Sequence, residues 1–188
     1  LKELNSNLQG DLDEMKSDIS RMDENQIAFH EIIEDLKENT IPSAKFYNNV
    51  SRLKQAPHFD PNKSGYEFLQ SKGVDIITND NLREKISNHY ELSYPYYNKY
   101  ENERIQFKTH QINTFLMHNF TWLDDPDFGG RDSFEISNED YLTIRNQGTF
   151  EKLVAATAWE NNLINQRAKR IREQIKNLIQ LINEELEI

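Results

Sequence analysis

Apolar residues recur every seven positions through the first 36 residues, and this spacing constrains the fold more than any other feature of the chain. The repeat consists of Leu1, Leu8, Met15, Met22, Phe29 and Leu36. Such a stripe is typical of a long helix that buries one seam against other helices. We therefore expect one helix over about 1–38 with a coiled-coil-like seam.

Two later segments, about 82–120 and about 150–186, also carry apolar residues at helical spacing. Pro95 interrupts the first of them, because proline lacks a backbone N–H and its ring clashes with the carbonyl four residues earlier. We therefore expect a kink near 93–96. Shorter helices are predicted over about 42–54, 66–72 and 138–147.

The composition favours a thin bundle over a thick globular core. Hydrophobic residues make up 36% of the 188 residues, below the roughly 45–50% of an average globular domain. A bundle can fold with so few, because each helix commits only one stripe to the interior. The prediction is a single all-α domain over 1–188, an antiparallel four-helix-like bundle of long helices with short connecting helices.

Charge and cysteine content exclude several functions. The net charge of -10 repels phosphate backbones, so we expect no nucleic-acid partner. The absence of cysteine excludes a disulfide framework, a thiol nucleophile and cysteine-ligated zinc. The sequence has no run of 18 apolar residues, so it contains neither a membrane span nor a signal peptide.

The charge is distributed unevenly between the first and the last predicted helix. Residues 1–40 contain eleven acids and four bases. The middle of the last helix is basic, with Arg167, Lys169, Arg170, Arg172 and Lys176 against Glu173. These two helices would attract each other if adjacent, although apolar burial is expected to dominate their packing.

Helix signals are densest between residues 64 and 90. Ser64 with Glu67 fits a capping box, and Gly73 fits a helix stop with positive φ. Candidate N-caps of the next helix are Asn79, Asp80 and Asn81, and Glu84 would complete a second box if Asn81 were the cap. For Arg83 we favour a structural role, bonding loop carbonyls or a carboxylate such as Asp75, over anion sensing.

This segment resembles the pattern S-x-Y-x-x-L-x-x-x-G-x-x-x-I-x-N-x-x-L-R-x-x-I-x-x-x-Y of the Bacteroidota domain-of-unknown-function family 6090. The matching residues are Ser64, Tyr66, Leu69, Gly73, Ile77, Asn79, Leu82, Arg83, Ile86 and Tyr90. Members of that family resemble one another in a short basic N-terminus, one transmembrane helix and a helical domain of about this size. The resemblance thus implies a membrane anchor through a segment absent from this chain, and it implies no activity.

Tyrosines and His89 cluster on the predicted helix near Pro95. Tyrosine combines a large ring with a polar tip, which suits helix cores, protein interfaces and ligand pockets alike. We expect Tyr96 and Tyr100 to lie on the surface as a candidate interaction surface. The remaining residues are expected to form core, with a small-molecule pocket as the alternative: His89, Tyr90, Tyr94 and Tyr97.

No residue pattern predicts a metal, cofactor or catalytic site. His110 and His118 lie eight residues apart, which is too far for one ion, because helical metal pairs are three or four apart. Asp124, Asp125, Asp127 and Asp132 form an acidic run without EF-hand spacing, and we interpret it as an ordinary surface loop.

These observations together predict a non-enzymatic, membrane-anchored extracytoplasmic interaction or scaffold domain. Under the positive-inside rule, a basic segment before the implied span would place the domain at the periplasmic face of the inner membrane. Its partners would be proteins of the cell envelope, and a homo-oligomer is left open. The alternative is a sensor-like helical bundle that binds a small ligand.

Overall fold

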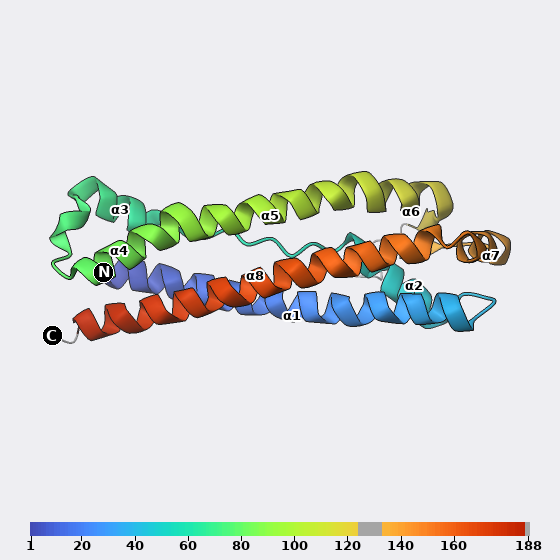
Figure 1. Cartoon of the computed structure of the whole chain (residues 1–188), viewed down its shortest axis with the longest axis horizontal. Helices are drawn as coiled ribbons and strands as arrows, with labels where there is room; N and C mark the ends of the chain where they lie inside the picture. Colours follow the sequence, from blue (N-terminus) through green and yellow to red (C-terminus); the bar gives the residue numbers. More distant parts are fainter. Residues whose placement is uncertain (124–132, 187–188) are drawn as a thin grey trace. The chain divides into compact units, whose positions relative to one another are not determined.

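The computed structural model describes residues 1–123 and 133–186 and confirms the all-α class (Figure 1). The two longest helices are α1 (Lys2–Glu38) and α8 (Thr149–Leu186). A third helical stretch consists of α4 (Asp80–Asn88), the π-helical turn η3 (His89–Ser93), α5 (Tyr94–Phe107), the π-helical turn η4 (Lys108–Asn113) and α6 (Thr114–Asn119). The long helices therefore lie within two residues of the predicted bounds.

The shorter elements connect these helices. They are α2 (Ala44–Val50), the 3-10 turn η1 (Ser51–Lys54), α3 (Ser64–Lys72), the 3-10 turn η2 (Val74–Ile76), α7 (Asn138–Gln147) and the strands β1 (Thr121–Leu123) and β2 (Ser133–Glu135). The two strands form a small antiparallel pair that the sequence did not predict, with Trp122 opposite Phe134. The acidic run from Asp124 to Asp132 lies outside the described residues.

The chain forms two compact units. Unit 1 comprises Leu1–Ser20, His58–Glu101 and Ile164–Ile188, and unit 2 comprises Arg21–Pro57 and Asn102–Leu163. In unit 1 the α8 portion runs antiparallel to the α1 portion, and the amide of Asn5 donates to Asn183 at 2.8 Å (Figure 1). Their apolar stripes are buried: Leu4, Leu8, Leu12, Met15 and Ile19 from α1, and Ile164, Ala168, Ile171, Ile175, Leu178 and Ile182 from α8.

The α1 and α8 portions of unit 2 are also antiparallel neighbours. Asn161 donates to the carbonyl of Met22 at 2.8 Å, and Lys37 pairs with Glu151 at 3.3 Å. The predicted side-by-side packing of the first and last helices is thus confirmed within each unit. The Lys37–Glu151 pair places the base on α1 and the acid on α8, the reverse of the expected charge pattern.

Aromatic rings build the core of unit 2. The Phe46 ring lies 5.1 Å from Tyr141, 6.2 Å from Phe150 and 6.3 Å from Phe120 between ring centroids. The hydroxyl of Tyr141 donates to the Asp35 carboxylate at 2.7 Å, so its polar tip is satisfied inside the core. Helix α2 begins at Ala44, with Ser43 as its N-cap at 3.1 Å from the Phe46 nitrogen, so Pro42 precedes the helix.

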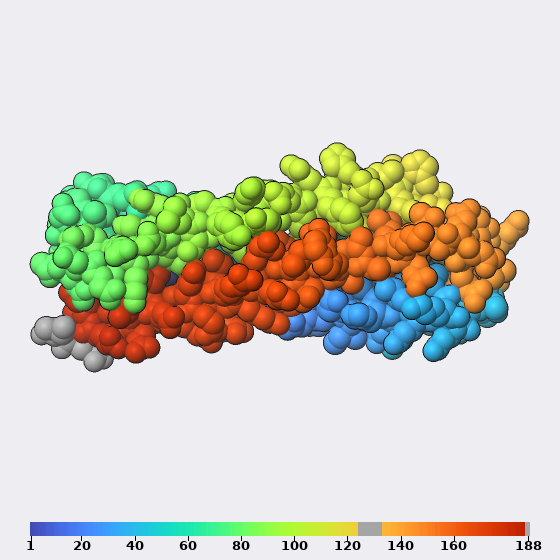
Figure 2. Space-filling model, in the orientation of Figure 1, coloured from blue at the N-terminus to red at the C-terminus, as the bar shows by residue number. Residues whose placement is uncertain are grey.

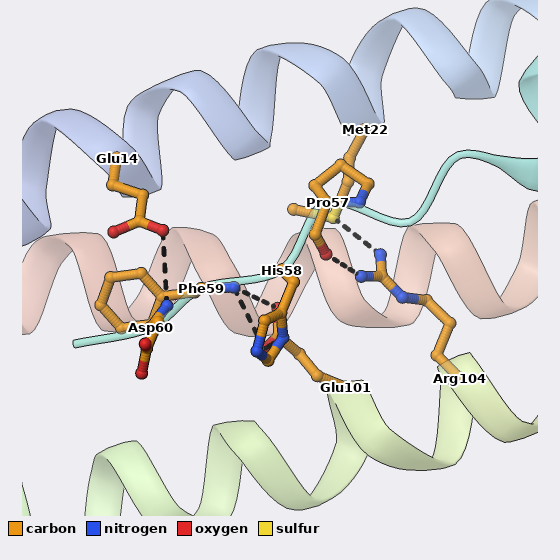
Figure 3. Close-up of polar contacts among 8 residues, drawn as sticks. All are labelled: Glu14, Met22, Pro57, His58, Phe59, Asp60, Glu101 and Arg104. Carbon is orange, nitrogen blue, oxygen red and sulfur yellow. Dashed lines mark hydrogen bonds and ion pairs between the residues drawn. The ribbon is translucent and has the colours of Figure 1, made fainter. Parts of the chain in front are cut away.

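In unit 1 an extended segment, residues 58–63, lies against α1 where a fourth helix would lie in a regular bundle. The backbone N–H of Asn62 donates to Asp11 at 2.9 Å, and that of Asp60 donates to Glu14 at 3.4 Å. The N–H of Phe59 donates to the buried Glu101 at 3.3 Å (Figure 3). Helix side chains thus replace the internal hydrogen bonds that an extended segment lacks.

In unit 2, the side chain of Arg104 satisfies a backbone carbonyl of a non-helical segment. Its guanidinium donates to the carbonyl oxygen of Pro57 and lies 3.5 Å from the sulfur of Met22 (Figure 3). Arg104 is only 6% exposed. Its burial is therefore explained by its bond to a chain segment that forms no helix of its own.

The helix signals of residues 64–90 are confirmed in part. Gly73 ends α3 with φ 88°, and Asn79 caps α4 by accepting from the N–H of Leu82 at 3.1 Å. The capping box at Ser64 is wrong, because Ser64 is itself the first residue of α3. The N–H of Ser64 donates to Asn62 at 3.0 Å and that of Gly65 donates to Asn7 at 2.9 Å.

A π-helical turn lies directly before Tyr94 and Pro95. The N–H of Tyr94 donates to the carbonyl of His89, five residues earlier, and α5 begins at Tyr94. Since Pro95 has no N–H, the wider turn places the irregularity directly before it. We predicted a kink near 93–96. The structure has an irregularity close to this position, but it is a π turn over His89–Ser93.

Candidate functional site

The residues predicted as core or pocket lie inside unit 1. Tyr90, Tyr94 and Tyr97 are 4%, 2% and 1% exposed, and His89 is 3% exposed. The His89 ring lies 4.1 Å from Tyr94 and 5.6 Å from Tyr90 between centroids. The hydroxyl of Tyr94 donates to Asp11 at 2.7 Å. These rings fill space between helices; His89 also lines one surface cavity, and Tyr97 lines another.

One cavity, which we call the His89 cavity, lies between the end of α4, the π turn and α8. Its volume is about 230 Å³. Its lining residues are Lys85, Asn88, His89, Ser93, Gln174, Asn177 and Leu178. His89 and Leu178 are buried, whereas Lys85, Asn88, Gln174 and Asn177 are exposed. The cavity therefore has a buried base and a polar, accessible rim.

A second cavity, the Tyr96 cavity, adjoins the first because both are lined by Ser93 and Gln174. Its volume is about 300 Å³. The other lining residues are Leu92, Tyr96, Tyr97, Arg167, Arg170 and Ile171. Figure 2 shows segment 80–101, in green, meeting the red C-terminal part of α8 on one face of unit 1.

The predicted interaction residues Tyr96 and Tyr100 lie next to this second cavity. Their ring centroids are 4.9 Å apart, and the guanidinium carbon of Arg167 lies 3.9 Å from the centroid of Tyr100. Tyr96 is 55% exposed and Leu92 is 63% exposed. We call the group Leu92, Tyr96, Tyr100, Arg167 and Arg170 the Tyr96 surface.

The electrostatics of the two cavities differ. Burial lowers the pKa of His89 to about 4, although a hydrogen bond with Gln174 acts in the opposite direction, so this imidazole is neutral at pH 7. Hydrogen bonds with Tyr100 and Arg167 lower the pKa of the exposed Tyr96. The His89 cavity thus presents neutral polar groups with one ammonium at its rim, and the Tyr96 surface presents two guanidinium groups.

Three other residues of segment 64–90, Arg83, Tyr66 and Leu82, have structural roles. Arg83 donates to the carbonyl of Ile77 at 3.0 Å and pairs with Asp80 at 2.5 Å, and Asp75 lies 3.9 Å away. This confirms its predicted role in fixing the connection before α4. Tyr66 stacks on Tyr90 at 4.6 Å and donates to Glu91 at 2.6 Å, and Leu82 is fully buried.

Sequence reasoning missed the half of the site that α8 supplies. The sequence showed that the middle of this helix is basic. It did not show that Arg167, Arg170 and Gln174 face the tyrosines. Their spacing of three and four residues places them on one helix face and was the available signal. Leu92 was missed because the π turn, which shifts the helical phase, cannot be read from spacing alone.

Neither a metal cluster nor a membrane span is found in the described part of the chain. Within residues 1–123 and 133–186, no three His, Asp or Glu side chains are grouped as a metal site requires. No described helix combines the length and the apolar character needed to cross a membrane.

Comparisons of the chain with family models, with curated proteins and with solved structures gave no significant match. The resemblance to family 6090 therefore stays a prediction.

Proposed function

We propose that the chain is a non-enzymatic interaction domain that binds an acidic segment of another cell-envelope protein through the Tyr96 surface. The observation that carries this proposal is the exposure of Tyr96 and Leu92 beside Arg167 and Arg170. Tyrosine and arginine are enriched at the centres of protein interfaces, and exposed lysine and glutamate are depleted there.

Arg167 is held in place before any partner arrives. Its guanidinium stacks on the Tyr100 ring at 3.9 Å, and the Tyr96 and Tyr100 rings contact each other edge to face. A side chain that is ordered in advance loses less conformational entropy when it binds. Arginine also binds carboxylates through two parallel hydrogen bonds, which favours an Asp or Glu side chain as its ligand.

The charge distribution further selects the partner. The chain as a whole carries a net charge of -10, so its general field repels acidic proteins. The two arginines of the Tyr96 surface provide a local exception on α8. A partner with carboxylates beside an apolar side chain would pair its acids with Arg167 and Arg170 and place the apolar group against Ile171 in the Tyr96 cavity.

The cellular placement rests on the family resemblance. A membrane anchor before this chain, preceded by a basic segment, would hold the domain at the periplasmic face of the inner membrane. Alkaline phosphatase fused after Ile188, in the protein with its natural N-terminus, should then be active in intact cells. Activity only of a cytoplasmic reporter at the same position would refute this placement.

Binding is tested by recovery of partners from membranes that contain the anchored protein. We expect Tyr96→Ala with Tyr100→Ala, and separately Arg170→Glu, to lose an acidic partner that the unsubstituted protein recovers. The matched control is Trp159→Ala, because Trp159 is a 60% exposed aromatic of unit 2 outside the Tyr96 surface. Equal recovery by all variants, with unchanged melting temperatures, would refute the proposed surface.

A further inference from the structure

His89 presents a buried polar atom that the fold does not satisfy. Its side chain is 3% exposed, and its Nε2 atom has no hydrogen-bond partner among the described residues. A buried nitrogen without a partner is unfavourable, and such groups are few in folded proteins. His89 is also one of the residues that line the cavity of about 230 Å³, so a polar molecule bound there lies beside this side chain.

The chemistry of the lining narrows the choice of molecule. Asn88, Gln174 and Asn177 contribute amides, and Ser93 contributes a hydroxyl; each of these groups can both donate and accept. Lys85, in the last turn of α4, is the charged group at the rim. None of the described lining residues carries a carboxyl group, so the lining favours an anion over a cation.

We propose that the His89 cavity binds a small hydroxylated carboxylate of about the size of a monosaccharide acid. The carboxylate pairs with Lys85, while hydroxyl groups bond the amides and His89. A hydroxyl both donates and accepts, so it satisfies Nε2 in either tautomer of the neutral imidazole. The volume of about 230 Å³ lies below the roughly 300–1,000 Å³ of drug-sized pockets and fits a ligand of this size.

Other classes of ligand match the lining less well. An apolar molecule would give Nε2 of His89 no hydrogen-bond partner and would shield the exposed amides of Asn88, Gln174 and Asn177 from solvent. A divalent metal would find a single imidazole and no carboxylate among the described lining residues. Acetate or another simple carboxylate only accepts hydrogen bonds and leaves the acceptor oxygens of the amides without a donor.

This inference does not rest on the proposed protein partner, since Tyr96, Tyr100, Arg167 and Arg170 do not line the His89 cavity. It is tested by titrating the full ¹⁵N-labelled chain with D-glucuronate, D-galacturonate and D-gluconate, with D-glucose and acetate as comparisons. We expect saturable shifts at Asn88, His89, Gln174 and Asn177 with at least one of the three hydroxy acids. Glucose and acetate should bind more weakly than that acid.

Variants locate the site. Lys85→Ala should weaken binding of the acid about tenfold, the loss expected for one charge-assisted hydrogen bond, and leave glucose unchanged. Asn177→Ala should weaken the acid and glucose alike. The matched control is Lys176→Ala, which removes a neighbouring lysine of α8 that does not line the cavity and should leave binding unchanged. His89→Phe should abolish the shifts if its melting confirms folding.

Three results would overturn the inference. The first is the absence of saturable shifts with all three acids up to about 10 mM, which corresponds to binding weaker than about 3 kcal/mol. The second is equal affinity for glucose and the acids, which removes the role of Lys85. The third is binding that Lys85→Ala and Asn177→Ala leave unchanged, which places the ligand elsewhere.

Discussion

The two units use their aromatic residues in different ways. In unit 2, Phe46, Phe120, Tyr141 and Phe150 pack against one another, and the cavity beside Phe29 and Arg104 has a volume of only about 20 Å³. In unit 1, Tyr94 is buried, whereas Tyr96, two residues later, is exposed next to cavities of about 230 and 300 Å³. Unit 1 also packs rings, as where Tyr66 stacks on Tyr90 at 4.6 Å, and unit 2 also exposes Trp159. What distinguishes unit 1 is the pair of larger cavities near Tyr96, and the proposed contact surface is placed there for that reason.

The largest expected effect concerns the packed core of unit 2. Phe46→Ala should lower the free energy of unfolding by about 3–5 kcal/mol, because it removes a ring that contacts four other aromatic rings. Urea denaturation followed by circular dichroism measures this loss. Tyr96→Ala is the counterpart in unit 1 and should change stability little. Equal losses for the two variants would remove the contrast between packed and exposed rings.

The next effect is the pH dependence that the buried His89 imposes on unit 1. The pKa of this side chain falls from its ordinary 6.5 to about 4 in the folded state because burial disfavours the charged imidazole. Between these values the unfolded chain binds a proton that the folded chain does not. The free energy of unfolding should therefore decrease as the pH falls from 6.5 toward 4, by about 3 kcal/mol in total.

Asp11 acts in the opposite direction, because burial raises its pKa and its folded form gains stability on protonation. Asp11 is the same in both proteins, so a comparison of His89→Gln with the unsubstituted chain over the range from pH 6.5 to 4 isolates the histidine. Denaturation across that range should show a weaker slope for His89→Gln than for the unsubstituted chain. Identical slopes would mean that His89 is accessible to protons in the folded state.

Gly65→Ala should destabilise unit 1 by about 1–3 kcal/mol through overpacking. A Cβ atom at this position would lie 2.6 Å from the side-chain oxygen of Asn7 and 2.9 Å from the Cα of Leu4. Gly10→Ala is the matched control in the same unit, since a Cβ there meets nothing within 4 Å and alanine favours a helix interior. Thermal melting should move in opposite directions for the two variants, and a shared direction would contradict the close approach at Gly65.

The smallest of these effects is expected at Gly73. Its φ of 88° is unfavourable for residues with a Cβ, although no atom lies within 4 Å of one built there. Gly73→Ala should therefore cost about 1 kcal/mol through backbone strain alone. An unchanged melting temperature would show that the connection after α3 relaxes without loss.

The sequence predicted those elements that local spacing determines. The seven-residue repeat predicted α1, and the candidate cap Asn79 marked the start of α4. Ser64 was wrongly predicted as a cap. The N–H of Gly65 in the first turn of α3 donates instead to Asn7, which is distant in the sequence. Residues 58–63 form no helix, in agreement with the gap between the helices predicted over about 42–54 and 66–72 and with Pro61 inside that gap.

The candidate site was less predictable for a physical reason. Its tyrosines lie close together in the sequence and were recognised as a cluster. Tyr90, Tyr94 and Tyr97 are buried and Tyr96 is exposed as predicted, whereas Tyr100 is half-buried. The arginines and amides come from α8, and only tertiary packing brings them to the tyrosines. The π turn adds a change of helical phase between Asn88 and Tyr94 that a regular period cannot represent.

Site-specific photocrosslinking tests the contrast between the units most directly. A benzoylphenylalanine residue replaces Tyr96 of unit 1 in one variant and Trp159 of unit 2 in another, both in the protein with its natural N-terminus. Adducts are identified by mass spectrometry after irradiation of intact cells. We predict one dominant adduct with an acidic envelope protein from position 96, lost on Arg170→Glu, and none from position 159. Adducts of equal yield from both positions, or from position 159 alone, would contradict the assignment of the contact surface to unit 1.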